Sequence, residues 1–449
     1  MRLRSIRAGA VVMGIGLMVA IAAAPSTASA EPVWGAPVTL GSTEREGGAP
    51  VVAVAPDGEA VAAWQGRKPA GIYVSSRAPG GRWSPHLALA QTRGEVEGPQ
   101  IAVVARKTVV IWTETIHTRF GEARVVMAAT RMRGKRWGRP RNISKEKRYR
   151  WESEGSEPQV TLTRGGKAIA IWQGSDEGHL ATPFIKTVTQ GVAGTRWTAP
   201  VGIRGSYEGQ APQVKATPGG EAVAIWGASY NEESGIDTSS RPKRGPWKTA
   251  GRLGFPGPFP APELAMTPKG EAIAAWTKEP EDSYGSTIQV ATRPPGGKWK
   301  VKTLDPQGYG THPQIVVEPG GKATVFWVEN VTFDEAVVAA STHVAGGGWS
   351  EPVNLADEGS PIPAEWDARW AVTGDGESIA VWAAGSSFGE GTKILASSRP
   401  RGQGWSKPMG LFASPRAPAG GEAELDLALA TSGEATLVWR CFDGKEWVA

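Results

Sequence analysis

One pattern of apolar and polar positions recurs along the chain. Three copies read "PVVAVAPDGEAVAAW" (50–64), "PQVKATPGGEAVAIW" (212–226) and "PQIVVEPGGKATVFW" (313–327). Each begins with small apolar and β-branched residues in alternation, makes a turn rich in Pro and Gly, and continues as a nearly unbroken apolar run to a tryptophan. Alternation predicts a half-buried strand, and the unbroken run predicts a strand covered on both faces. A helical repeat is excluded by the two-residue period and by the recurring glycines.

The repeat occurs eight times at intervals of 48 to 60 residues, ending at Trp64, Trp112, Trp172, Trp226, Trp276, Trp327, Trp382 and Trp439. Self-similarity at such a period is typical of a solenoid or a propeller. After each of these tryptophans come a third predicted strand, such as 72–77, a Gly-rich turn, and a second tryptophan that opens a fourth strand, such as 83–89. Four strands in about fifty residues predict the blade of a β-propeller.

The two ends of the chain suggest how the ring closes. The last copy stops at Ala449 with room for three strands, while Trp34 to Leu40 resembles a fourth strand without a blade of its own. We therefore predict an all-β, eight-bladed propeller of four-stranded blades as a single domain over 31–449. The N-terminal strand would complete the last blade and leave no open sheet edge. An alternative alignment starts a fourth strand at Trp447 and leaves Trp34 on an extra edge strand.

Residues 1–30 have the pattern of an export signal. Arg2, Arg4 and Arg7 precede an apolar run (8–24), and Ala28-Ser29-Ala30 has the small residues of a cleavage site. We expect cleavage after Ala30 and a secreted or extracytoplasmic protein, with an uncleaved membrane anchor as the alternative.

Net charge and cysteine content limit the partners of the chain. The formal net charge of +5 falls to +2 without the three signal arginines, so it gives no reason to expect nucleic acid as a partner. We expect a monomer that does not contact the membrane after cleavage. The single cysteine, Cys441, cannot form an internal disulfide, and we interpret it as a small buried side chain.

The turn before the second tryptophan is also repeated. In six of seven copies Ser or Thr lies seven residues before it (Ser76, Thr130, Ser240, Thr292, Thr342 and Ser398), and in six Gly lies three residues before it (Gly80, Gly134, Gly194, Gly296, Gly346 and Gly402). This turn resembles the Asp-box, or BNR, repeat of sialidase-type propellers, over nearly the whole mature chain. The aspartate of the box is absent, as are the Arg-Ile-Pro signature and the Tyr-Glu-Arg set of sialidases. The resemblance therefore implies the fold without the activity.

An arginine recurs six residues before the second tryptophan, at Arg77, Arg131, Arg241, Arg293 and Arg399, with His343 in a sixth copy. These cations could form an anion-binding ring. Because the same position is cationic in blade after blade, we interpret it as a packing device, a guanidinium against an indole. The repeated tryptophans are likewise predicted to be core.

Variable loops provide the candidate binding residues. Loops between the second and third strands and between blades are long and diverse, and all of them lie on one face, which we call the long-loop face. Diversity confined to one face is typical of a binding surface. The candidate ligand-binding residues on it are Tyr149, Trp151, Tyr207, Tyr230, Tyr284, Tyr309 and Trp366. Aromatic rings near carboxylates suit a carbohydrate or a cationic peptide; alternatively, the rings fill their own loops.

Enzyme motifs are weak. "GSSFG" (385–389) lies in a strand-to-strand loop rather than in a nucleophile elbow, and the five histidines lack zinc-ligand spacing. We expect no catalytic residue, no metal site and no cofactor. The sequence thus favours an exported binding scaffold for a carbohydrate or a protein. One alternative is a sialidase-like glycoside hydrolase that uses Glu208, Glu281, Asp282 or Glu335; another is a structural surface protein without a discrete ligand.

Overall fold

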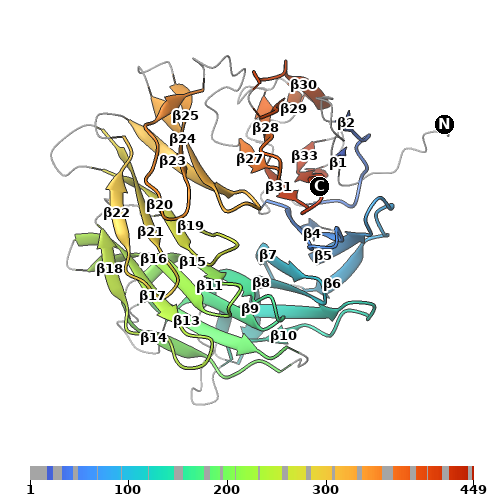
Figure 1. Cartoon of the computed structure of the whole chain (residues 1–449). Coiled ribbons are helices and arrows are strands. Elements are labelled where there is room, and N and C mark those ends of the chain that lie inside the picture. Colours follow the sequence, from blue (N-terminus) through green and yellow to red (C-terminus); the bar gives the residue numbers. More distant parts are fainter. Residues whose placement is uncertain are drawn as a thin grey trace.

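The computed structural model describes residues 18–23, 33–43, 49–67, 69–92, 94–119, 121–145, 155–175, 183–192, 196–207, 209–230, 233–254, 261–279, 285–305, 309–330, 336–355, 368–384, 391–401, 403–416, 424–442 and 447–448. Every regular element among them is a β-strand. The strands form twisted sheets arranged around a central axis (Figure 1).

Seven blades are each built from four consecutive antiparallel strands. The first blade contains β3 (Val51–Val54), β4 (Ala60–Arg67), β5 (Ala70–Arg77) and β6 (Leu87–Gln91), and the second contains β7 (Val96–Val104), β8 (Lys107–Thr118), β9 (Gly121–Met132) and β10 (Arg141–Asn142). The third contains β11 (Gly155–Leu162), β12 (Ala168–Ser175), β13 (Pro183–Gln190) and β14 (Val201–Tyr207), and the fourth contains β15 (Gly209–Ala216), β16 (Ala222–Tyr230), β17 (Glu233–Arg241) and β18 (Gly251–Gly254). The fifth blade contains β19 (Glu263–Met266), β20 (Ala272–Lys278), β21 (Thr287–Arg293) and β22 (Lys300–Thr303), and the sixth contains β23 (Gly310–Val317), β24 (Ala323–Asn330), β25 (Ala336–His343) and β26 (Val353–Asn354). The seventh contains β27 (Arg369–Val372), β28 (Ser378–Ala384), β29 (Gly391–Arg399) and β30 (Met409–Arg416).

The prediction of eight blades is wrong, because the last repeat does not build a blade. Among the described residues it supplies only β31 (Leu425–Leu429) and β32 (Ala435–Trp439) to a larger sheet, and the chain then forms a separate hairpin of β33 (Cys441–Phe442) and β34 (Trp447–Val448). Beside β32 lies β1 (Met18–Ala23), from the predicted export signal, and β2 (Val33–Trp34) pairs with β1. This closing sheet, β31-β32-β1-β2, lies between the first and seventh blades.

The predicted closure is wrong in its third strand. β2, which contains Trp34, is the outer strand of the closing sheet, but it pairs with β1 rather than with a third strand of the last repeat. The last repeat lacks a long third strand of its own, since β33 and β34 pair only Cys441 with Val448 and Phe442 with Trp447. Residues from the other end of the chain occupy that place, in register from Met18 opposite Trp439 to Ala22 opposite Ala435. The alternative alignment fails too, since Trp447 belongs to this hairpin rather than to a fourth strand.

The tryptophan that ends each second strand lies in the core, as predicted. All eight are at most 2% exposed. Trp226 on β16, for example, packs with Ile169 and Ile171 of β12 and with Ile185 of β13, in the preceding blade. The core is therefore a series of layers between adjacent sheets, and each blade is covered by its two neighbours.

The second tryptophan of a blade packs beneath the repeated cation. The guanidinium carbons of Arg77 and Arg131 lie 5.7 and 5.3 Å from the ring centres of Trp83 and Trp137. His343 stacks on Trp349 at 5.1 Å between ring centres. The interpretation of these cations as packing devices is confirmed in these blades.

The same cations also link adjacent sheets. Glutamate five residues before the buried tryptophan accepts from the cation of the following sheet, in the pairs Arg77–Glu434 (2.5 Å), Arg131–Glu59 (2.6 Å), Arg293–Glu221 (2.8 Å) and His343–Glu271 (3.2 Å). We call these the interblade pairs. The Arg77–Glu434 pair joins the first blade to the closing sheet, so it helps to hold the two ends of the chain together.

Four sheets depart from this pattern at the position five residues before the buried tryptophan. In the sixth blade it holds Lys322, which pairs with Glu318 of its own blade at 3.3 Å. Lys107 takes the place in the second blade, is 2% exposed, and donates from Nζ to the carbonyl oxygens of Gly166 and Gly191 at 3.0 Å. Burial lowers its pKa to about 8. In the third blade burial, followed by the charge of Arg241, lowers the pKa of Lys167. Glu377 of the seventh blade has no interblade pair among the described residues, and burial raises its pKa.

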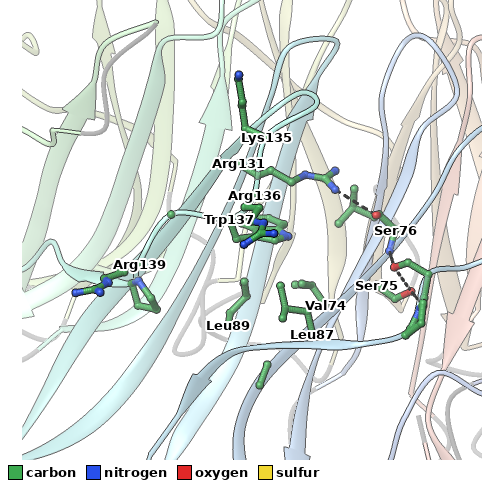
Figure 2. Close-up of a pocket in the computed structure, with 16 residues that line it drawn as sticks. Val74, Ser75, Ser76, Leu87, Leu89, Arg131, Lys135, Arg136, Trp137 and Arg139 are labelled. Carbon is green, nitrogen blue, oxygen red and sulfur yellow. Dashed lines mark hydrogen bonds between the residues drawn. The ribbon is translucent and has the colours of Figure 1, made fainter.

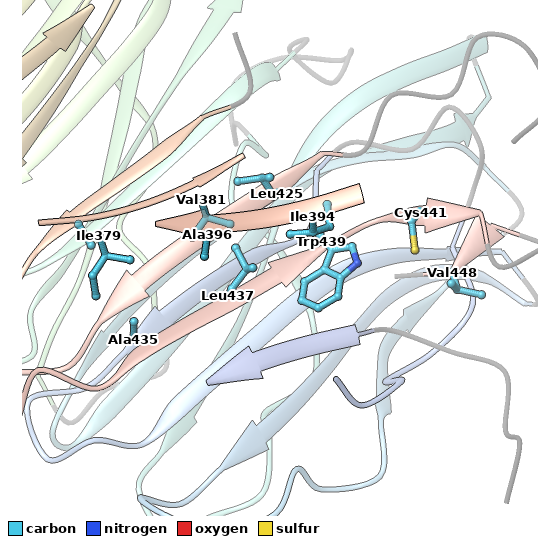
Figure 3. Close-up of a cluster of buried hydrophobic side chains, with 11 residues drawn as sticks. Ile379, Val381, Ile394, Ala396, Leu425, Ala435, Leu437, Trp439, Cys441 and Val448 are labelled. Atoms are coloured by element: carbon cyan, nitrogen blue, oxygen red, sulfur yellow. The ribbon is translucent and has the colours of Figure 1, made fainter. Parts of the chain in front are cut away.

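The last core layer joins the seventh blade to the closing sheet. Ile379 and Val381 of β28 pack with Leu437 and Trp439 of β32 (Figure 3). Cys441 belongs to this cluster and is 2% exposed, so the prediction of a buried cysteine is confirmed.

We predict that Trp226→Ala lowers the free energy of unfolding by about 3–5 kcal/mol, because it empties a closely packed layer between two blades. Urea unfolding followed by circular dichroism measures the loss. Trp247→Ala, at the half-buried second tryptophan of the same blade, is the matched control and should cost clearly less. Equal losses in the two variants would contradict the role given to the buried layer.

A second prediction compares Glu434→Gln with Glu377→Gln. Loss of the Glu434 carboxylate leaves the buried guanidinium of Arg77 uncompensated and should cost about 2–3 kcal/mol. Glu377 has a raised pKa, so its ionised form destabilises the fold once the pH rises above that pKa, and Glu377→Gln should be neutral or stabilising at pH 7. Urea midpoints at pH 7 test both; a larger loss in Glu377→Gln would refute the assignment of the interblade pairs.

Candidate functional site

The first strand of each blade begins at the long-loop face, next to the axis of the ring (Figure 1). Several of these strands carry a β-bulge at that end. Glu157, Ala211 and His312 occupy the bulges with φ angles of 51°, 47° and 53°, and each precedes a proline. Left-handed backbone is uncommon outside glycine, and a following proline restricts the residue further. Bulges and strain of this kind are over-represented near functional sites.

The position directly after the bulge or proline carries a polar side chain in almost every inner strand. In the strand pairing this position lies opposite the residue before the buried tryptophan in all seven blades and in the closing sheet. It holds Val51, Gln100, Gln159, Gln213, Glu263, Gln314, Arg369 and Asp426. All eight are half-buried. We call the seven polar members the axial polar ring.

Two carboxyl groups of the axial polar ring share an electrostatic environment. Burial raises the pKa of Glu263 and of Asp426, while the charges of Lys215 and Arg369 act on both groups in the opposite direction. These four residues come from β15, β19, β27 and β31, which belong to four different sheets. The same two cations therefore act on carboxyl groups that belong to two other sheets.

Hydrogen bonds fix parts of this arrangement. Asp426 Oδ2 accepts from the Val52 amide at 2.8 Å, and its Oδ1 accepts from the Leu427 amide at 3.0 Å. Gln314 Nε2 donates to the Ala368 carbonyl of the next blade at 2.7 Å. These bonds tie each side chain to its own or a neighbouring inner strand, so its position is set by the ring.

The bulges are also connected to one another. The amide of Ala211 donates to Glu157 Oε2 at 2.7 Å, which links the third blade to the fourth above the axial polar ring. Glu157 is exposed on the long-loop face. The strained backbone is thus held by a contact between blades rather than within one.

The structure describes only part of the candidate residues predicted from the loops. Tyr149, Trp151, Tyr284 and Trp366 lie outside the described residues, as do Glu208, Glu281, Asp282 and Glu335 of the alternative hydrolase. The backbone of Tyr207 ends β14 and that of Tyr230 ends β16, both towards the long-loop face.

Tyr309 is described in full and fits the predicted surface. Its side chain is 49% exposed, and it lies immediately before β23 on the long-loop face. Its amide donates to Glu329 Oε1 at 2.7 Å, and its carbonyl accepts from Asn330 Nδ2 at 3.1 Å. The backbone is therefore fixed while the ring remains accessible.

Sequence reasoning missed the axial polar ring. The signal was present in the repeat itself, as the glutamine of the Pro-Gln pair at 99–100, 158–159, 212–213 and 313–314. The pair looked like the start of a strand, and nothing in one repeat shows that this position recurs on the inner strand of successive sheets. Glu263, Arg369 and Asp426 are the informative departures from glutamine.

In the described part of the chain, no three His, Cys, Asp or Glu side chains gather closely enough to hold a metal ion. Nor does this part contain a helix long and apolar enough to cross a membrane.

Comparison with known proteins yields structural neighbours alone. No family model matches the sequence. No curated protein matches it either. Similar solved structures include a protein of unknown function from Dyadobacter fermentans, with 14% identity and a TM-score of 0.44 over 68% of this chain and 96% of that one.

Sialidases are among these neighbours. The Trypanosoma rangeli sialidase in complex with sialic acid has 10% identity and a TM-score of 0.40, over 91% of this chain and 85% of that one. The NanB sialidase from Streptococcus pneumoniae has 10% identity and a TM-score of 0.41, over 86% and 81%. At these identities and TM-scores the likeness assigns neither an activity nor a ligand, and the blades themselves define the fold.

We predict that Glu263→Gln stabilises the protein at pH 7. Burial raises the pKa of Glu263 above its ordinary value of 4.5, so ionisation of this carboxyl costs free energy in the folded state and stability falls as the pH rises above 4.5. The gain should disappear as the pH falls to 4, where both folded and unfolded chains are protonated. Urea unfolding at pH 7 and pH 4 measures it. Glu351→Gln, at an exposed carboxyl, is the control and should change little.

Proposed function

We propose that this protein is an exported binding scaffold whose ligand is a carbohydrate, bound at the axial polar ring on the long-loop face. The observation that supports the proposal most directly is the ring of hydrogen-bonding side chains at one register position of successive inner strands. A scaffold that needed only stability would favour apolar residues there, as Val51 illustrates in the first blade.

The chemistry of the ring suits a sugar. Each glutamine presents one acceptor and two donors on a planar group, which matches the paired donor and acceptor character of neighbouring hydroxyls. Arg369 adds donors and Glu263 and Asp426 add acceptors, so hydroxyl groups of either orientation can be satisfied. The exposed ring of Tyr309 on the same face can stack on the apolar side of a sugar. Convergent polar groups on a largely apolar scaffold are typical of a small-molecule site.

Hydrolysis of the bound sugar is the second candidate function. It is favoured by one observation, the raised pKa of two carboxyls, Glu263 and Asp426, that respond to the same two cations. A general acid at neutral pH requires such a shift, and glycosidases use a pair of carboxyl groups. These residues replace the loop carboxyls that the sequence suggested for an alternative hydrolase.

The test is a glycan-array screen of the full chain, with release of reducing sugar monitored in parallel. For a sugar that is retained, Gln159→Leu combined with Gln213→Leu should weaken binding at least about tenfold, because two hydrogen-bonding groups are lost from the ring. Val51→Leu, at the apolar member of the same register position, is the matched control and should bind as the wild type does.

The outcomes separate the candidates. Retention without turnover supports the binding scaffold, whereas turnover abolished by Glu263→Gln and by Asp426→Asn supports the hydrolase. Retention unaffected by the double leucine variant would place the ligand elsewhere on the protein. Absence of both retention and turnover on every sugar would contradict both carbohydrate functions and leave a protein ligand or a structural role.

A further inference from the structure

A groove lies between the first two blades, away from the axis. It is a cavity of about 670 Å³ between the outer strands β5 and β6 and the turn that follows β9 (Figure 2). Its floor is apolar, formed by Val61, Val74, Leu87, Ala88 and Leu89. Leu87 is 49% exposed, so part of this floor is open to solvent. Trp137 adds a half-buried aromatic wall.

The rim of the groove is basic. Lys135, Arg136 and Arg139 line it and are exposed. Among the residues that the structure describes, no carboxylate forms an ion pair with any of these three. Three cations next to an apolar floor give the groove a charge that nothing nearby in the described chain neutralises.

Arg131 has a different role from the three rim cations. Its Nη2 pairs with Glu59 at 2.6 Å, its Nη1 donates to Ser76 Oγ at 3.1 Å, and its guanidinium lies over Trp137. These contacts connect the two blades and hold the indole in place. Arg131 therefore shapes the wall of the groove, and its charge is already compensated.

The opposite wall is fixed by hydrogen bonds. Ser75 Oγ donates to the Ser84 carbonyl at 2.7 Å, and the Ser76 amide donates to Ser84 Oγ at 3.1 Å. With both walls held in this way, the groove exists before any ligand arrives. A preformed hollow with an apolar floor and a few charged groups is the usual form of a small-molecule site.

We propose that this groove binds an amphiphilic anion, a molecule with one apolar chain and a terminal phosphate, sulfate or carboxylate. The apolar chain would lie on the floor between Leu87 and Leu89, and the acidic group would meet Lys135, Arg136 and Arg139. Charge complementarity selects the acidic end, and the apolar floor selects against a purely polar anion. Because the hollow is bounded by two blades, its occupant is a single molecule rather than a lipid surface.

Basic turns alone would not make such a site. The equivalent turn of the fourth blade also carries three exposed cations, Lys243, Arg244 and Lys248. They provide a matched control, since their loss removes the same charge from the same kind of turn on a different blade. A site that depends on the groove will respond to the first set of cations and not to the second.

The experiment is a calorimetric titration of the full chain with monomeric dodecyl phosphate. Binding should weaken at least about tenfold when Lys135, Arg136 and Arg139 are all changed to Gln, because charge-assisted contacts to the acidic group are lost. Changing Lys243, Arg244 and Lys248 to Gln should leave the affinity within about twofold of the wild type. Leu87→Gln, which keeps every cation, should also weaken binding because it makes the floor polar. Dodecanol and inorganic phosphate, each carrying half of the required chemistry, should bind at least about tenfold more weakly than dodecyl phosphate.

Five results would overturn the proposal. Equal losses from the two triple variants would show that any basic turn attracts the anion. An unchanged affinity in Leu87→Gln, or equal affinity for inorganic phosphate, would show that the floor takes no part. Binding to phosphatidylglycerol vesicles but not to the monomer would indicate a lipid surface instead, and absence of any binding would remove the site altogether. Circular dichroism of each variant confirms that the fold is retained, and Lys135→Gln alone, at an exposed position, provides a second variant if the triple variant does not fold.

Discussion

The burial of one tryptophan per repeat between adjacent sheets is the contact on which the rest of this structure depends. Each second strand is apolar on both faces, so it is stable only when a neighbouring blade covers each side. No blade can satisfy this requirement alone, and an open array would leave two uncovered faces. Closure into a ring is the arrangement that covers every sheet. The interblade pairs then bring charged groups into the same interfaces, where a partner from the next sheet compensates each one.

The sequence predicted those features that the repeat itself specifies. The period of the buried tryptophans located the sheets, and alternation within each copy located the strands, because both follow from which side chains a neighbouring blade must cover. Closure was predicted wrongly in its third strand. The partner of β32 comes from Met18–Ala23, an apolar segment that also fits an export signal, and pairing between distant segments leaves no periodic trace in the sequence. Cleavage after Ala30 stays a prediction.

The candidate site also combines features that the sequence shows with features that only the structure shows. Aromatic residues in the variable loops could be recognised because they depart from the repeat, but loop length gives no information on where their side chains lie. The axial polar ring could not be recognised in this way, because its glutamines do not depart from the repeat. Gln100, Gln159, Gln213 and Gln314 are part of the repeat, and their common orientation follows from strand register, which only the folded ring displays. Charge at Glu263, Arg369 and Asp426 was visible in the sequence, but not the fact that these residues occupy equivalent positions.

The bulges before the polar position affect which insertions and deletions in the adjoining loops this protein tolerates. In four blades the pairing skips between Glu97 and Gln100, between Ser156 and Gln159, between Gln210 and Gln213, and between Thr311 and Gln314. Side chains alternate along a strand, so a shift of one residue beyond this point would move each amide to the other face of its sheet and put an apolar neighbour in its place. The β-bulge takes up a difference in length between the loop and the strand, so the register beyond it does not change. Insertions and deletions in the adjoining loops can therefore accumulate while the phase of the inner strand, and with it the composition of the axis, is preserved.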